Sequence, residues 1–399
     1  MLLTGSRQRP FWRLSLGLLL SGALTLAATP VAAAVPLISA KPDRTVGFDG
    51  LVYASAQVGT TVYLGGNFTH AIVDGKPVAR KRLAAVDTRT GQLLPWAPRS
   101  DGTVLAVTVA GSTLYVTGTF TTIAGLPRAG LAGINLSTGN VGPLQHTITG
   151  TPRALAATAG RLFVGGDFTK VDGRAAPNLA AFRLSDGAVD TGFRGSANKK
   201  VQVLYAAGPR LYVGGYFTSL NNVTGTGRLA ALRPADGQVD PQFRSATPYP
   251  VYALTATADR LFAALAGPGG RVVAYQPNGT LMWSSVTDGD VQAITYLNGA
   301  IYAGGHFTVV CPTPFASATA WCKVTKLDHP KLAAWDPATG AVLAWNPQSN
   351  GKWGVLTLGA DPVRRTITVG GDFTAFGTAA RLRFAKFGAC AYGCGQPGR

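Results

Sequence analysis

One pattern of hydrophobic and polar positions recurs along most of the chain. An apolar residue, two small residues, a variable residue, Phe and Thr follow one another at 64–69, 116–121, 164–169, 213–218, 303–308 and 369–374. A degenerate copy lies at 261–265. A run rich in β-branched, aromatic and Leu residues, such as Thr113–Tyr115, leads into each copy and predicts a β-strand.

A second apolar phrase follows most copies and ends in a tight turn. It reads Leu-Ala-Ala or Leu-Ala-Gly at 83–85, 131–133, 179–181, 229–231 and 332–334. Thr-Gly, Asp-Gly or Asn-Gly then stands at 90–91, 138–139, 186–187, 236–237, 278–279 and 339–340, and such turns join antiparallel strands. A short run ending in a large apolar residue completes each unit: Trp96, Leu144, Phe193, Phe243, Trp283 and Trp345.

The spacing of the copies gives the number of units. The Phe anchors from Phe68 to Phe217 recur every 48 to 52 residues, and the step of 90 residues to Phe307 holds the degenerate copy. The last step, to Phe373, is 66 residues because the sixth unit carries an insertion. Seven units of four short strands predict an all-β fold, a seven-bladed β-propeller with four-stranded blades.

The two ends of the repeated region suggest how such a ring closes. The seventh unit stops after its third strand, Leu382–Phe387, with no turn and no fourth strand behind it. Near the other end of the chain, Arg44–Phe48 has the form of a fourth strand, and Phe48 matches the Phe or Trp that ends the others. We expect this mature N-terminal strand to complete blade seven, which removes exposed sheet edges.

The recurring phrase Leu-Tyr-Val-Gly-Gly-x-Phe-Thr, followed by the Leu-Ala phrase, resembles the delta-60-type bacterial β-propeller repeat. That resemblance covers nearly the whole mature chain and implies the fold, while the function of the family is unsettled. More weakly, 85–96 and 334–345 resemble the tryptophan-docking repeats of quinoprotein dehydrogenases. Those enzymes usually combine a vicinal disulfide with a Glu-containing calcium site, and this sequence has neither adjacent cysteines nor Glu. We therefore predict no cofactor.

The composition removes other classes of protein. All 18 acidic residues are Asp, and the chain holds 51 Gly and 25 Pro, which speaks against a helix bundle or coiled coil. A hydrophobic fraction of 46% with only 14% charged residues speaks against disorder. The formal net charge is +18, which favours anionic partners.

The N-terminus predicts export. Arg7, Arg9 and Arg13 precede an apolar run at Leu14–Leu26, and Ala32–Ala34 offers a small-residue cleavage site. These features indicate a secretory signal peptide at 1–34, because the apolar run is too short for a comfortable membrane span. We expect one propeller domain at 35–390, a short tail at 391–399, secretion as a monomer, and no membrane insertion after cleavage.

Four cysteines in an exported chain predict two disulfides. Cys311 and Cys322 bracket the insertion of the sixth unit, and Cys390 and Cys394 follow the last strand. We expect the pairs Cys311–Cys322 and Cys390–Cys394 on opposite faces of the propeller. Because four thiolates on two faces cannot share one ion, we predict no metal site.

Catalytic signatures are sparse. None of the four histidines forms a zinc-binding pair, and no nucleophile elbow is present. Most aspartates stand in turns, but Asp49, Asp101, Asp288 and Asp290 precede the strands that would line the central channel. We predict a secreted non-catalytic binding or scaffold propeller with a basic face and no catalytic residues. The alternative is a hydrolase or lyase that acts on polysaccharide with a site at the channel mouth.

The binding prediction rests on one face. Loops leading into first strands and loops between second and third strands share that face in a propeller. They would supply the ligand-binding residues Arg82, Arg128, Arg153, Lys200, Arg228, Tyr252, Asp290, Lys331, Trp353 and Arg381. We expect an anionic cell-envelope polysaccharide or a protein partner, and disfavour nucleic acid because no nucleic-acid module is present. The alternative that the bases only solvate loop ends stays open.

Overall fold

The computed structural model describes Met1, Gly5, residues 36–158 and residues 160–389. The chain divides into two units, Met1–Ala34 and Val35–Arg399. The predicted signal peptide, the C-terminal tail and the predicted Cys390–Cys394 disulfide lie outside the described residues. No helix in the described part of the chain has the length and apolar character needed to cross a membrane.

Seven antiparallel sheets follow one another in the described chain, each built on three consecutive long strands. The first strands are β2 (Val52–Val58), β7 (Val104–Ala110), β12 (Ile148–Thr158), β16 (Val201–Ala207), β19 (Val251–Ala256), β23 (Val291–Leu297) and β29 (Val355–Asp361). The second strands are β3 (Thr61–Gly66), β8 (Thr113–Gly118), β13 (Arg161–Val171), β17 (Arg210–Gly215), β20 (Leu261–Leu265), β24 (Ala300–Gly305) and β30 (Thr366–Gly371). The third strands are β6 (Leu83–Asp87), β11 (Leu131–Asn135), β15 (Leu179–Arg183), β18 (Leu229–Leu232), β21 (Arg271–Tyr275), β27 (Leu332–Trp335) and β33 (Phe384–Phe387).

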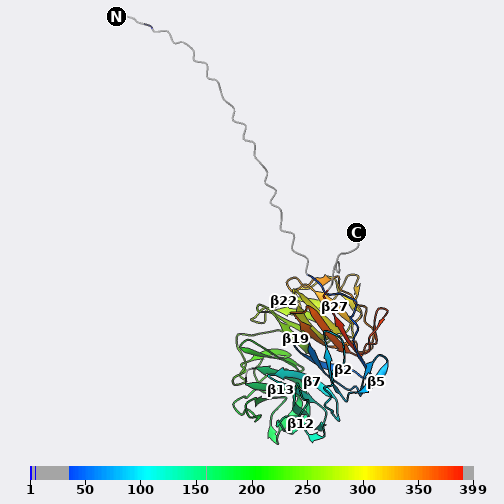
Figure 1. Cartoon of the computed structure of the whole chain (residues 1–399). Coiled ribbons are helices and arrows are strands. Elements are labelled where there is room, and N and C mark those ends of the chain that lie inside the picture. The colour runs from blue at the N-terminus through cyan, green and yellow to red at the C-terminus, as the bar shows by residue number, and fades with distance from the viewer. Residues whose placement is uncertain (2–4, 6–35, 159, 390–399) are drawn as a thin grey trace. The chain divides into compact units, whose positions relative to one another are not determined.

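The first strands lie next to one another in chain order. Each contacts the first strand of the following sheet, as β2 and β7 do in Figure 1, and β29 contacts β2. The predicted all-β class is confirmed, since every regular element in the described residues is a strand. The start of each first strand is thereby brought to the same end of the molecule.

Short hairpins extend the loops between second and third strands. They are β4 (His70–Val73) with β5 (Lys76–Ala79), β9 (Thr122–Ile123) with β10 (Leu126–Pro127), the end of β13 with β14 (Arg174–Ala175), β25 (Val309–Val310) with β26 (Leu327–Asp328), and β31 (Ala375–Phe376) with β32 (Ala379–Ala380). The insertion predicted in the sixth unit lies between β25 and β26. The predicted Cys311–Cys322 disulfide closes this insertion, with the two Cα atoms 5.7 Å apart.

The fourth segment of the repeat is a regular strand in two sheets. These strands are β22 (Leu281–Val286) and β28 (Val342–Leu343). In four other sheets the fourth segment pairs through one bridge only: Val86–Leu93, Ile134–Val141, Phe182–Val189 and Leu232–Val239. A few backbone hydrogen bonds accompany these bridges, such as that from the N–H of Leu94 to the carbonyl of Ala85 at 2.8 Å.

The N-terminal segment joins the last sheet, but not in the predicted register. Residues 38–43 run along β33: the N–H groups of Ser39 and Asp43 donate to the carbonyls of Gly388 and Lys386, at 3.0 and 2.8 Å. The strand β1 (Gly47–Phe48), inside the predicted closing strand 44–48, pairs instead with β4.

Phe48 does not occupy the repeat position of the Phe or Trp that ends the other fourth strands. Phe48 pairs with Ala71 as Ser100 pairs with Ile123, so Phe48 occupies the repeat position of Ser100. The position of Trp96, four residues earlier, falls on Arg44. The ring of Phe48 instead packs below the first sheet, 4.5 Å from the ring of Phe68.

Candidate functional site

All seven first strands are irregular at the same point. Each ladder shifts register at this repeat position, as between Val52 and Ala54 in β2 and between Pro152 and Ala154 in β12, and β12 has a second irregularity between Thr149 and Gly150. A β-bulge of this kind redirects a side chain and is common beside binding sites. The bulged residues form one repeated set: Tyr53, Leu105, Arg153, Gln202, Tyr252, Gln292 and Leu356.

The variable residue before the Phe anchor lies beside this set. The hydroxyl oxygens of Tyr216 and Tyr252 are 2.5 Å apart, and Gln292 Nε2 lies 3.3 Å from Nδ1 of His306. Both contacts join a second-strand end to the bulge of a first strand. We call the end of the molecule where these two sets meet the mouth.

One part of the mouth concentrates charge. Lys200 Nζ lies 4.1 Å from the centre of the Tyr216 ring. Burial lowers the pKa of Lys200, the charge of Arg153 lowers it further, and Asp167 opposes both effects. Arg153, Asp167 and Lys200 therefore lie within electrostatic range of one another.

Tyr252 connects this charge to a further carboxylate. Burial raises the pKa of Tyr252, and the contact with Tyr216 and the charge of Asp290 raise it further. Asp290 itself accepts a hydrogen bond from the N–H of Gly267 at 3.0 Å. We define the mouth cluster as Arg153, Asp167, Lys200, Tyr216, Tyr252 and Asp290.

Two cations of the mouth cluster have no internal partner. In the described residues, neither Arg153 nor Lys200 donates a hydrogen bond or forms an ion pair, and Nε of Arg153 is buried without an acceptor. Both side chains are only partly exposed. Partly buried cations that make no hydrogen bond or ion pair are costly, and an anionic ligand that bonded to both would offset that cost.

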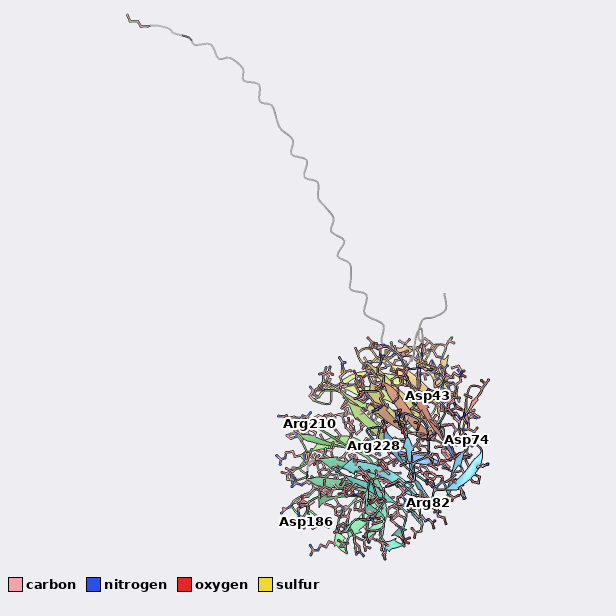
Figure 2. All side chains as sticks on the ribbon, in the orientation of Figure 1. Asp43, Asp74, Arg82, Asp186, Arg210 and Arg228 are labelled. Carbon is pink, nitrogen blue, oxygen red and sulfur yellow. A yellow bond between two sulfur atoms is a disulfide. The ribbon has the colours of Figure 1, made fainter. Side chains whose placement is uncertain are left out.

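The other predicted bases are tethers within the fold. Arg82 Nη1 donates to the carbonyl of Ser100 at 3.0 Å. Arg228 donates to the carbonyl of Tyr216, and Lys331 Nζ to that of His306 at 2.9 Å. Figure 2 labels Arg82 and Arg228.

Arg128 and Arg381 also bond to backbone carbonyls. Arg128 Nη2 donates to Gly142 at 2.7 Å, and Arg381 Nε donates to Asp43 at 2.7 Å. Arg128 thus joins the loop before β11 to the fourth segment of the same sheet. Arg381 joins the loop before β33 to residues 38–43, which run along β33. The predicted set of bases on one face is thus largely occupied with internal contacts, and only Arg153 and Lys200 differ.

Two bases that the sequence analysis did not select belong to these repeated positions. Arg383 has the positive φ of +62° that Arg82 also has at +67°, and it donates to the carbonyl of Phe48 at 3.1 Å. Arg80 donates to the carbonyl of Leu94 at 2.8 Å and is the counterpart of Arg128. Both could have been found from the sequence, because the arginines that bond to backbone carbonyls stand either one or three residues before a third strand.

Three aspartates considered for catalysis are structural clamps. Asp101 accepts hydrogen bonds from the N–H groups of Thr121 and Thr122 at 2.8 and 2.9 Å and from the Thr121 hydroxyl. Burial alone would raise the pKa of Asp101, but these hydrogen bonds outweigh it and lower the pKa to about 2. Asp49 and Asp288 bind Thr69 and Thr308 in the same way.

Asparagine does the same work in two other sheets. Asn198 accepts from the N–H of Thr218 at 2.9 Å, and Asn350 accepts from that of Thr374 at 2.7 Å. The position therefore requires an acceptor before the first strand and no negative charge. Of the four aspartates considered, Asp290 is the one whose charge raises the pKa of Tyr252 in the described structure.

Trp353 is exposed beside the start of β29. The residue is 51% exposed, and its backbone N–H donates to the carboxylate of Asp372 at 2.8 Å. Lys352 Nζ lies 5.5 Å from the centre of the Trp353 ring. No group of three or more His, Cys, Asp or Glu in residues 36–158 and 160–389 is arranged to hold a metal ion.

The comparisons agree with this architecture. Residues 160–193, which span β13 and β15, match the family model described as "Domain of unknown function (DUF5122) beta-propeller". This chain is a β-propeller repeat protein. The family resemblance predicted from the Gly-Gly-x-Phe-Thr phrase is thereby confirmed, and the comparison with curated proteins found no significant match.

Solved structures support the fold of this propeller and no more. The WD40 β-propeller domain of Doa1 aligns with a TM-score of 0.54 at 11% identity, over 87% of this chain and 95% of that one. The computationally designed Ika8 protein aligns with a TM-score of 0.49 at 15% identity, over 86% of this chain and 97% of that one. At 11% sequence identity, the similarity to Doa1 supports the fold alone.

Proposed function

We propose that the seven sheets are the blades of one closed propeller, and that residues 38–43 supply the fourth segment of the seventh blade. Contact between β29 and β2 supports closure, as do the hydrogen bonds that join residues 38–43 to β33. In this arrangement the bulged residues surround the central axis at the mouth. A repeated backbone feature then presents seven side chains of four kinds, Tyr, Leu, Gln and Arg, toward one space.

Within this fold, the protein binds an anionic ligand at the mouth and does not catalyse a reaction. The unpaired Arg153 and Lys200 carry the proposal, because they are neighbouring cations at the mouth that the fold does not use. Lys200 lies over the ring of Tyr216, which contacts Tyr252, and the bulge positions of other first strands supply the amides of Gln202 and Gln292. Such a mixture suits a glycan, whose hydroxyls take hydrogen bonds while its acidic groups bind the cations.

The hydrolase or lyase alternative is weaker after the assignment of the clamps. A glycosidase needs two carboxylates that converge on one bond. Asp49, Asp101 and Asp288 each spend both carboxylate oxygens on the following hairpin, which restricts the alternative to one pair, Asp290 and Asp167. Export through the predicted signal peptide would bring the protein to an anionic cell-envelope polysaccharide, the partner proposed here.

Binding to defined polymers tests this function. We expect polygalacturonate, a polymer of carboxylated sugars, and teichoic acid, a phosphate polymer, to retard the protein at low salt, and a neutral dextran to leave it unaffected. Salt should reverse the retention, because partly exposed charges are screened. Retention that persists in 1 M salt, or equal retention by dextran, would contradict an anionic ligand.

Matched variants separate the mouth from the total charge. Arg153→Gln/Lys200→Gln should reduce binding at least tenfold, whereas the control Lys81→Gln/Arg174→Gln removes the same charge from exposed hairpin positions. Equal losses in the two double variants would assign binding to the net charge and not to the mouth. Release of soluble oligosaccharide that Asp290→Asn abolishes would favour the enzyme.

A further inference from the structure

The insertion between β25 and β26 is braced on the outside of the fifth sheet. Phe315 exchanges two backbone hydrogen bonds with Ser284 of β22, at 2.8 and 2.9 Å, and the N–H of Cys311 donates to Val286 of β22 at 2.8 Å. Since β22 is the fourth strand of its sheet (Figure 1), the insertion covers an edge that would otherwise be exposed. The Cys311–Cys322 disulfide closes the loop.

A buried cation holds the far part of the insertion. Arg271 is fully buried, has no carboxylate partner in the described residues, and donates to the carbonyls of Gly269 and Ala320 at 3.0 and 3.1 Å. Its guanidinium lies 4.5 Å from the Tyr249 ring and 5.5 Å from the Trp321 ring. Tyr249 belongs to the segment just before β19, whereas Trp321 belongs to the insertion.

Beyond this anchor the loop exposes apolar side chains. Trp321 and Val324 are each 53% exposed, and Leu327 is 40% exposed. Three of the large hydrophobic residues that are exposed in the described chain therefore stand in one seven-residue stretch. Isolated exposed apolar residues need no explanation, but several in one short stretch of a disulfide-closed loop are typical of an interaction surface.

The same stretch carries an ordered pattern of charge. Lys323 and Lys326 alternate with the three apolar residues at a spacing of three, and neither lysine forms a hydrogen bond or ion pair in the described residues. No acidic residue occurs from 311 to 327, and Arg271 adds a further positive charge behind Trp321. The stretch therefore combines exposed apolar side chains with positive charges that the fold does not pair.

We propose that residues 321–327 form a docking surface for a protein partner with acidic residues around an apolar patch. Aromatic anchors on a pre-organised loop bind with a low cost in conformational entropy. Val324 and Leu327 favour a protein over a glycan, since they offer no hydrogen bonds to sugar hydroxyls. The net charge of +18 disfavours a second copy of this chain as the partner. The surface does not depend on the mouth cluster.

Selected peptides test the surface. A random peptide library is panned against the whole chain, with Lys323→Glu/Lys326→Glu as the counter-selection, and the selected peptides are synthesised and titrated. We expect sequences rich in Asp, Glu and large apolar residues, which bind at least tenfold more weakly to Trp321→Ala and to the double lysine variant. The exposed, uncontacted lysines can be changed without loss of folding, which unfolding transitions check.

Trp353→Ala is the matched control, because Trp353 has nearly the same exposure and a neighbouring lysine outside the loop. It should leave peptide affinity unchanged. Peptides that bind all variants equally, or a selection that yields no loop-dependent peptide, would overturn the proposal. So would a loss of polygalacturonate binding in Lys323→Glu/Lys326→Glu, because that result would make the loop part of a glycan site.

Discussion

The seam between the sixth and seventh sheets differs from the closing seam between the seventh and first sheets. At the seam between the sixth and seventh sheets, Trp345 is fully buried, with its ring 4.9 Å from that of Tyr302 and 5.6 Å from that of Phe387. Its Nε1–H donates to the carbonyl of Ser39 at 3.1 Å. Four other sheets carry the same aromatic pair: Tyr63–Trp96, Phe163–Phe193, Tyr212–Phe243 and Phe262–Trp283.

The closing seam has polar residues at the equivalent positions. Thr368 stands where Tyr302 stands in the sixth sheet, and Arg44 stands where Trp345 does. Lys386, opposite Thr368 in the ladder, forms an ion pair with Asp43 at 2.8 Å.

The rest of this seam is also polar. The hydroxyl groups of Ser55 and Thr357 are 3.0 Å apart, and the buried hydroxyl of Thr368 has no hydrogen-bond partner among residues 36–158 and 160–389. A groove of about 700 Å³ lies beside Arg44 on the outside of the first sheet. The comparison teaches that the repeat joins its sheets by an aromatic lock, and that the seam joining the chain ends uses ion pairs and tethers instead.

The largest expected effect comes from breaking the aromatic seam. Trp345→Ala removes a fully buried ring and its hydrogen bond, and we expect it to lower the free energy of unfolding by about 3–5 kcal/mol. Guanidinium unfolding followed by fluorescence and circular dichroism measures the change. A loss below about 1 kcal/mol would mean that the aromatic lock does not hold the seam.

The polar seam is tested by removing one member of its ion pair. In Asp43→Ala the Lys386 ammonium, whose side chain is only 12% exposed, loses its partner, and we expect a loss of about 1–3 kcal/mol. Asp43→Ala/Lys386→Met should recover most of this loss, because it removes the unpaired charge as well. A double variant less stable than Asp43→Ala would contradict this account of the seam.

The clamps on the two sides of the closing seam respond differently to acid. Burial alone would raise the pKa of Asp49, but hydrogen bonds from Thr69 and His70 hold that pKa well below its usual value. On the other side of the seam, the equivalent position before β29 is the uncharged Asn350. The contribution of Asp49 is therefore complete above about pH 4 and decreases as the pH falls further. Asp49→Ala should cost about 1–2 kcal/mol at neutral pH.

Asp49→Asn is the control for this clamp. We expect it to stay within about 0.5 kcal/mol of the parent at neutral pH, because Asn350 and Asn198 make the same contacts with Thr. It should also lose less stability between pH 5 and pH 3 than the parent does. An identical acid dependence of the two proteins would show that the charge of Asp49 is irrelevant to the seam.

The smallest effect is expected at Arg44. Its side chain is 86% exposed and that of its partner Asp74 is 74% exposed, so the pair at 2.7 Å is strongly screened. Arg44→Ala should change the free energy of unfolding by less than about 0.5 kcal/mol. A larger loss in thermal or guanidinium unfolding would indicate that Arg44 replaces the aromatic lock energetically as well as in position.

Repetition explains how much the sequence could predict. Period and turn residues indicated the β-propeller, and the bracketing of the insertion indicated the Cys311–Cys322 disulfide. The closing segment was misaligned because Phe48 has the side chain expected at the position that Arg44 occupies. Similarly, a repeated Arg or Asp shows that a position is used, but only the contacts distinguish the tether Arg82 and the clamp Asp101 from the unpaired Arg153.

Calorimetric titration with a short oligogalacturonate tests the central claim, that the mouth and not the distributed charge binds the ligand. The account predicts one site per chain, with affinity reduced at least tenfold in Arg153→Gln/Lys200→Gln and unchanged in Lys81→Gln/Arg174→Gln. Several equivalent weak sites per chain, with the same affinity in both double variants, would contradict it.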